Sequence, residues 1–304
     1  MFSKSIPLSL NRRGGNGARV PGRLKGATVR VGIVGAGALG TVFAEALAPV
    51  VPVEILRRGD DPRRFADVDW VLIAVKTYDT LAALRPLRAV LRPDAAVVSL
   101  QNGLLQVAQI ESALGAGRII VLAPTTEGAM RDAAGVARRR GTGSTVVGIP
   151  AGRLGTDRVD ALADLLGAAG LAAAVAAPIE PHLWAKLVVN AAINPVTALA
   201  RRSNAHVLDD PDARNRAAAL AREAAAVAAA AGIALPYSDP VARVLDVARA
   251  TSANRSSMLQ DLERGGPTEI EAINGEIVRL GRLFGVATPE NQRALDEVRR
   301  AAGA

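Results

Sequence analysis

The segment from Val29 to Ala48, VRVGIVGAGALGTVFAEALA, constrains the fold of this chain more than any other stretch. Its apolar run from Val31 to Val34 is typical of a strand that is buried on both faces of a parallel sheet. Gly35, Gly37 and Gly40 follow with the spacing Gly-x-Gly-x-x-Gly, and an amphipathic helical pattern comes next. This order of strand, glycine-rich turn and helix favours a dinucleotide-binding unit, whereas the glycines alone would indicate no more than a tight turn.

Each of the three glycines has a separate physical role in such a unit. Gly35 permits the tight turn, Gly37 allows a pyrophosphate to approach bare backbone, and Gly40 allows the helix to pack onto the strand. The free amides and the dipole at the start of the helix attract the anion. We therefore expect the negatively charged part of a dinucleotide to bind at this turn.

The end of the next strand indicates which dinucleotide is bound. That strand is predicted at Val51–Leu56, and Arg58 follows it closely. An acidic residue at this place favours NAD, whereas an arginine offers a planar set of donors for the 2′-phosphate of NADP. NADPH is therefore the predicted cofactor. NAD remains the alternative cofactor, because the acidic residues Asp60 and Asp61 lie just beyond Arg58. The alternative for Arg58 itself is an ordinary solvated surface arginine.

The rest of the first half alternates strands and helices, which predicts a Rossmann-type, doubly wound parallel sheet in an α/β fold. Ligands of such sheets lie at the carboxyl ends of the strands, where Lys76 and Asn102 are found. A solvated lysine and a simple Asn-Gly turn are the alternatives for these two residues. Further strands are expected at Trp70–Val75, Ala96–Leu100, Arg118–Ala123 and Ala172–Ala176, and helices at Asp79–Leu91, Leu104–Leu114 and Arg153–Ala169. Short β-runs are expected over Gly128–Ile149.

The pattern becomes helical after Pro178 and Pro181. We predict a disordered basic leader at 1–27, a dinucleotide-binding domain at 28–178, and an all-helical substrate and catalytic domain at 179–304. A substrate would meet the cofactor in the cleft between the two domains. Helices are expected at His182–Ile193, Asp212–Ala231, Pro240–Ala250, Asn254–Arg264, Thr268–Phe284 and Pro289–Ala302.

Composition excludes several other classes of protein. The net charge is +8, but six basic residues and no acidic ones lie in 1–27, and aromatic residues make up only 3% of the chain, so a nucleic-acid surface is not expected. With no cysteine and two histidines, no disulfide, thiol nucleophile or metal site is expected. The alanine-rich runs at 165–179 and 224–237 are too short and too weakly apolar for membrane spans.

The basic leader contains no continuous apolar core, so it does not read as a secretory signal. A disordered tail or an upstream start codon explains it most simply, with an organellar targeting peptide as the alternative. A cytoplasmic protein is therefore expected.

Polar residues form a narrow stripe on one predicted helix of the second half. Lys186, Asn190 and Asn194 are spaced four residues apart on an otherwise apolar helix, which favours the wall of a polar pocket over a solvated face. Farther on, Thr268 and Glu271 have the spacing of a helix capping box. The capping box gives Glu271 a structural role and leaves Glu269 without one.

The chain resembles the ketopantoate reductase family, the NADPH-dependent 2-dehydropantoate 2-reductases of pantothenate biosynthesis, from Thr28 to Ala302. The similarity rests on VGIVGAGALG, AVKTYDT, SLQNGL, LWAKLVVNAAINPVTAL and NRSSMLQDLERGGPTEIEAINGEIVRLGRLFGVATPEN. The segment Gly59–Asp69 is shorter than its usual counterpart in the family. The resemblance implies that Lys186 is the general acid and that Glu269 assists beside it. It implies substrate contacts from Asn102, Asn190, Asn194, Asn254 and Ser257, and cofactor contacts from Gly35, Ala36, Gly37, Ala38, Leu39, Gly40, Arg58, Lys76 and Asn102.

The expected activity is the reduction of 2-dehydropantoate (ketopantoate) to pantoate. Hydride transfer to the C2 ketone places negative charge on the carbonyl oxygen, which a lysine ammonium can neutralise and then protonate. One alternative is a reductase of another 2-oxo acid with the same residues, and another is a non-catalytic NADP(H)-binding sensor. The expected partner is a small-molecule 2-oxo acid, and the chain is expected to be a monomer or a homodimer joined through its helical domain.

Overall fold

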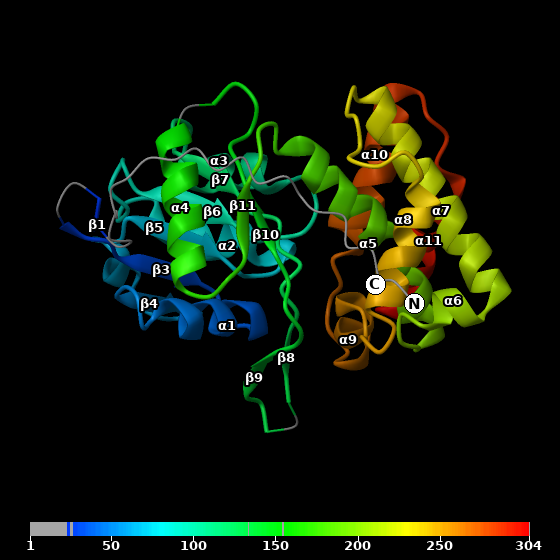
Figure 1. Cartoon of the computed structure of the whole chain (residues 1–304), viewed down its shortest axis with the longest axis horizontal. Coiled ribbons are helices and arrows are strands. Elements are labelled where there is room, and N and C mark those ends of the chain that lie inside the picture. The colour runs from blue at the N-terminus through cyan, green and yellow to red at the C-terminus, as the bar shows by residue number, and fades with distance from the viewer. Residues whose placement is uncertain (1–22, 25–26, 133, 154, 304) are drawn as a thin grey trace, which may run out of the picture.

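The computed structural model describes residues 23–24, 27–132, 134–153 and 155–303, and these form an α/β domain followed by a helical domain. Figure 1 shows the two domains side by side, with helix α5 (Glu180–Ala200) leading from the first into the second. Most of the predicted leader lies outside the described residues. Near its end, β1 (Arg23–Leu24) and β2 (Ala27–Thr28) pair as antiparallel strands.

The α/β domain is built on a sheet of five parallel strands, as the sequence predicted. The strands lie in the order β4-β3-β5-β6-β7, so the chain starts in the sheet at β3, next to β4 and β5. Every residue of β3, β5, β6 and β7 is buried, which explains their continuous apolar runs. The bounds are β3 (Val31–Val34), β4 (Val53–Leu56), β5 (Trp70–Ile73), β6 (Ala96–Ser99) and β7 (Ile120–Leu122).

Helices cover both faces of the sheet. One face packs against α1 (Ala38–Leu47) and α4 (Thr156–Ala168). The other packs against α2 (Thr80–Leu84), α3 (Gln106–Leu114), and the 3₁₀ turns Pro62–Phe65 and Arg85–Leu87. A further 3₁₀ turn, Thr77–Asp79, precedes α2. The predicted helix at Asp79–Leu91 is therefore divided, and Pro86 lies where its second part begins.

The short connection between β4 and β5 contains a single 3₁₀ turn instead of a helix. Phe65 in this turn is fully buried, and its ring lies where a side chain at Gly32 would be, because a Cβ there would approach the ring to 2.6 Å. One aromatic ring packed on a glycine thus covers the part of the sheet that a crossover helix would cover.

Beyond β7 the chain forms short strands, as expected for Gly128–Ile149, and these belong to two separate two-stranded sheets. β10 (Thr145–Val147) joins β7 through antiparallel bridges and pairs in parallel with β11 (Ala173–Val175). β8 (Ala129–Arg131) and β9 (Ala137–Arg139) form an antiparallel hairpin that extends past the sheet and contacts α1 (Figure 1).

The helical domain packs around α5, which contacts most of its other helices. By length and composition α5 is apolar enough to cross a membrane, but 67% of its most apolar window is buried inside the protein, so it is the core helix of this domain. The remaining elements are α6 (His206–Asp209), α7 (Pro211–Ala230), α8 (Pro240–Ala250), α9 (Ser257–Glu263), a π-helical turn at Glu271–Gly275, α10 (Glu276–Phe284) and α11 (Pro289–Ala301).

The prediction that the first helix of this domain ends at Ile193 is wrong, because α5 continues through Pro195 to Ala200. Proline has no N–H for the carbonyl of residue i−4, here Ala191. The side-chain amide of Asn274 donates to that carbonyl instead, at 3.1 Å. Burial of 191–198 and this substitute donor keep the helix continuous.

The predicted capping box at Thr268 and Glu271 is also wrong. The Thr268 hydroxyl accepts from the amide of Ile270 at 3.4 Å, and the exposed carboxylate of Glu271 pairs with Arg299 at 2.6 and 2.8 Å. The local spacing fits a regular helix, but the helix here starts with a π-helical turn. This turn places Glu271 toward α11 and away from the Thr268 hydroxyl.

Candidate active site

A cleft of about 2030 Å³ is lined by residues of both domains. Every predicted catalytic, substrate-binding and cofactor-binding residue lines it except Gly40, which is buried beneath the glycine-rich turn. The α/β domain contributes Gly35, Ala36, Gly37, Ala38, Leu39, Arg58, Lys76 and Asn102, and the helical domain contributes Lys186, Asn190, Asn194, Asn254, Ser257 and Glu269.

The glycine-rich turn has the shape that a dinucleotide pyrophosphate requires. Gly35 has a φ of 107°, and a Cβ there would lie 2.7 Å from Val75 Cγ1. A Cβ on Gly40 would overlap the carbonyl oxygen of Gly35, so this glycine allows α1 to approach the turn. Gly37 is exposed, and the nearest atom to a Cβ there is 3.9 Å away, so its free side faces open space. The residues of the glycine-rich turn therefore fit the pyrophosphate of a dinucleotide.

Arg58 lies at the edge of the cleft, after the end of β4. Its side chain is 90% exposed, and Nη2 is 3.2 Å from Oδ1 of Asp79. Such an exposed ion pair stabilises little, so the guanidinium is free to exchange Asp79 for a phosphate. The sequence placed Arg58 at the carboxyl end of the second strand, and the structure agrees.

Lys186 projects from α5 into the cleft and is mostly shielded from solvent. Its Nζ donates to the carbonyl oxygen of Thr125 at 2.6 Å. Burial lowers the pKa of Lys186 to about 8, while the carboxylate of Glu269 acts in the opposite direction. The amine is thus anchored in the α/β domain and titrates close to neutral pH.

Glu269 forms a bridge between the domains. Its Oε1 accepts from the amide and the hydroxyl of Thr77, at 3.1 and 2.7 Å, and its Oε2 accepts from Nδ2 of Asn102 at 3.1 Å. Burial by itself would raise the pKa of Glu269, but Lys76, Thr77 and Asn102 together lower it below its ordinary value. Glu269 therefore acts on Lys186 through its negative charge, whereas its hydrogen bonds are made to Thr77 and Asn102.

Lys76 at the end of β5 is held by the helical domain. Its Nζ lies 2.6 Å from Oδ2 of Asp261 and 3.7 Å from Oε2 of Glu269. The Asp261 carboxylate also accepts from Arg264 at 2.5 Å. The positive charge of Lys76 is therefore already neutralised by carboxylates of the helical domain.

The predicted amide and hydroxyl groups gather in the same cleft. Nδ2 of Asn190 lies 3.5 Å from Oδ1 of Asn102, so these two amides link α5 to the end of β6. Ser256 caps α9 by accepting from Leu259, which leaves Ser257 free of the capping role. Asn194 is 6% exposed, whereas Asn254 is exposed and Ser257 is half-buried.

Sequence reasoning missed several residues of this network. Thr77 follows Lys76 at a strand end, so the rule that ligands lie at strand ends could have included it. Asp261 carried no such signal, because a single aspartate on a helix is usually exposed. No cluster of three or more potential metal ligands occurs in the part of the chain that the structure describes.

Comparisons with known proteins place this site in context. Residues 58–152 match the family described as ketopantoate reductase PanE/ApbA, and residues 178–302 match its C-terminal counterpart. A 2-dehydropantoate 2-reductase of Archaeoglobus fulgidus is 41% identical over 77% of this chain and 76% of its own length. One of Pyrobaculum aerophilum is 36% identical over 86% of this chain and 93% of its own length. The crystal structure of 2-dehydropantoate 2-reductase from Geobacter metallireducens superposes with a TM-score of 0.83 at 26% identity, covering 90% of this chain and all of that one.

Proposed function

The chain belongs to the ketopantoate reductase family, and from this we propose that it reduces 2-dehydropantoate to pantoate, with NADPH as hydride donor and Lys186 as proton donor. When bound, NADPH supplies the hydride that reduces the C2 ketone. The similarity to 2-dehydropantoate 2-reductases over most of the chain supports an oxidoreductase that acts on a CH–OH group.

The observation that carries this proposal is the position and pKa of Lys186. Its amine lines the same cleft as the glycine-rich turn, and its pKa of about 8 leaves most molecules protonated at neutral pH. A general acid works best when its pKa lies near the working pH. The ammonium group neutralises the charge that grows on the C2 oxygen and then delivers a proton to it.

The neutral polar groups of the cleft position the substrate. We assign the carboxylate and hydroxyl groups of the 2-oxo acid to Asn102, Asn190, Asn194, Asn254 and Ser257. Amides and hydroxyls offer both donors and acceptors without adding charge that would perturb Lys186.

Glu269 assists in two ways. Its charge raises the pKa of Lys186 and so keeps the acid protonated, and its hydrogen bond orients the Asn102 amide. Because it also binds Thr77, it holds the two walls of the cleft together. Loss of its carboxylate should therefore reduce turnover more than cofactor binding.

The preference for NADPH rests on Arg58, whose exposed guanidinium offers donors for a 2′-phosphate. The proposal also includes a cytoplasmic location and either a monomer or a homodimer joined through the helical domain. A light-scattering mass distinguishes the two assemblies.

The test is to follow consumption of NADPH with 2-dehydropantoate and with a panel of other 2-oxo acids. The proposal expects the highest specificity constant for 2-dehydropantoate. A higher value for another acid would assign a different substrate to the same site, and no consumption with any acid would favour a binding sensor. Lys186→Ala should lose most of the turnover and still bind NADPH, and loss of NADPH binding instead would refute the role of this residue.

A further inference from the structure

The β8–β9 hairpin places an arginine on the glycine-rich turn. Nη2 of Arg131 donates to the carbonyl oxygen of Ala36, which lies between Gly35 and Gly37. Nη1 donates to the carbonyl of Gly135 at 2.5 Å, and Arg131 lines the cleft together with the turn. The guanidinium therefore lies beside the place where a pyrophosphate meets the backbone amides.

Most other cations of the cleft are paired with carboxylates. Lys76 is bound to Asp261, Arg58 to Asp79 and Arg255 to Glu263. Among the residues that the structure describes, Arg131 has hydrogen bonds only to carbonyl oxygens and no carboxylate within ion-pair distance. A hydrogen bond from arginine to an anionic oxygen is roughly twice as strong as one to a neutral acceptor, so a phosphate would replace the Ala36 carbonyl.

The hairpin that carries Arg131 is held firmly at both ends. At its base the buried carboxylate of Glu127 accepts two hydrogen bonds from Arg139, at 2.7 and 2.8 Å. At its tip Asp132 accepts from the amide of Val136 at 2.9 Å and from Arg138 at 3.1 Å. The arginine is therefore positioned before any ligand binds, which reduces the entropy cost of binding.

We propose that Arg131 binds the pyrophosphate of the dinucleotide together with the amides at the start of α1, so that the hairpin forms a wall of the cofactor site. This inference rests on the proposed function only in requiring a dinucleotide cofactor. It assigns Arg131 to the pyrophosphate and leaves the 2′-phosphate to Arg58.

The test measures binding by calorimetry with three probes: NADPH, ADP-ribose, which has the pyrophosphate but neither nicotinamide nor 2′-phosphate, and adenosine 2′-monophosphate, which lacks the pyrophosphate. Arg131→Ala should weaken NADPH and ADP-ribose by a similar factor, about 10- to 100-fold, and leave adenosine 2′-monophosphate unchanged. Arg131→Gln should have the same effect, because it keeps a donor for Ala36 but carries no charge.

The matched control is Arg140→Ala, which removes an equal charge just after β9 at an exposed side chain that does not line the cleft. It should change binding of all three probes by less than about twofold, since screened surface charges act weakly at a distance. Equal binding of ADP-ribose by the Arg131 and Arg140 variants would overturn the inference and leave the proposed function intact. If the unaltered protein bound neither NADPH nor ADP-ribose, the proposed function itself would fail.

Discussion

The carbonyl of Ala191 gives the sharpest quantitative prediction, because its hydrogen-bond donor comes from a distant residue. Pro195 cannot supply the helical N–H, and Nδ2 of Asn274 supplies a donor instead. The same amide donates to Oδ1 of Asn291 at 3.0 Å, and Asn274 is fully buried. Asn274→Ala leaves two buried acceptors without a donor, at about 1–3 kcal/mol each, so we expect a loss of about 2–6 kcal/mol in unfolding free energy.

Pro195→Ala separates the contribution of the Ala191 carbonyl from that of the Asn291 side-chain oxygen. The substitution introduces an amide N–H that can reach the Ala191 carbonyl along the helix, so in this background Asn274→Ala leaves only the Asn291 acceptor unpaired. The cost of Asn274→Ala should then fall by the cost of one unpaired acceptor, about 1–3 kcal/mol, which is the coupling energy of the pair. Pro240→Ala is the control, because Pro240 is the first residue of α8 and frees no carbonyl within the helix.

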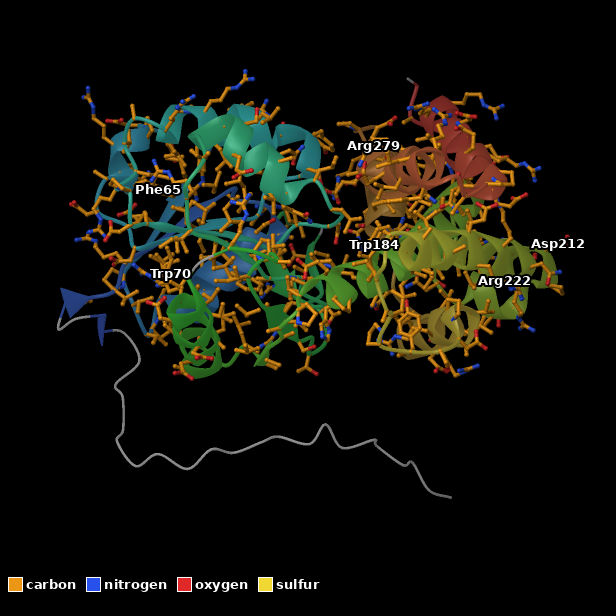
Figure 2. The ribbon with its side chains drawn as sticks, turned by 90° about the horizontal axis from the view of Figure 1, so that it is seen from above. Phe65, Trp70, Trp184, Asp212, Arg222 and Arg279 are labelled. Atoms are coloured by element: carbon orange, nitrogen blue, oxygen red, sulfur yellow. The ribbon has the colours of Figure 1, made fainter. Side chains whose placement is uncertain are left out.

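The assay is equilibrium unfolding in urea, followed by fluorescence of the helical domain alone. The chain has two tryptophans, Trp70 in the sheet and Trp184 in α5, and Figure 2 shows them in different domains. In a Trp70→Phe background the signal comes from Trp184, so the separate unfolding of the α/β domain does not enter. If the changes in unfolding free energy caused by Pro195→Ala and Asn274→Ala add within about 0.5 kcal/mol in the double variant, Asn274 does not replace the missing N–H.

Three further predictions concern the cleft, and a fourth concerns two glycines of the α/β domain. Turnover should fall as pH rises through about 8, tenfold per pH unit, because only protonated Lys186 donates a proton. Glu269→Gln should move that midpoint lower, since the carboxylate raises the pKa of the lysine, and an unmoved midpoint in the pH profile would contradict this. Arg58→Ala should raise the Michaelis constant for NADPH about tenfold and leave that for NADH unchanged, whereas equal effects would remove the 2′-phosphate argument. Gly40→Ala should lower the unfolding free energy by at least about 1–3 kcal/mol because its Cβ overlaps backbone, while Gly167→Ala, with open space inside α4, should raise it by about 0.5–1 kcal/mol. Urea unfolding followed by the Trp70 signal in a Trp184→Phe background measures both, because Trp70 lies in the same domain.

Local patterns in the sequence were sufficient to predict the parallel sheet, the glycine-rich turn and the polar stripe of α5. Each depends on a period or spacing within about 20 residues, and burial on a strand or along one helix face imposes that period directly. The rule that ligands meet the carboxyl ends of strands also predicted Lys76 and Asn102 as ligand-binding residues, and both line the cleft.

Only the tertiary structure decided how the two halves meet. Glu269 and Thr77 are 192 residues apart, and Lys76 and Asp261 are 185 apart, so no local period relates them. The same holds for Arg131 on Ala36 and for Asn274 on Ala191, where a donor from a remote element compensates a local deficit. Sequence determined which groups this protein brings to its cleft, because periodicity is a local property, and folding determined their partners, because hydrogen bonds form between whichever groups packing brings together.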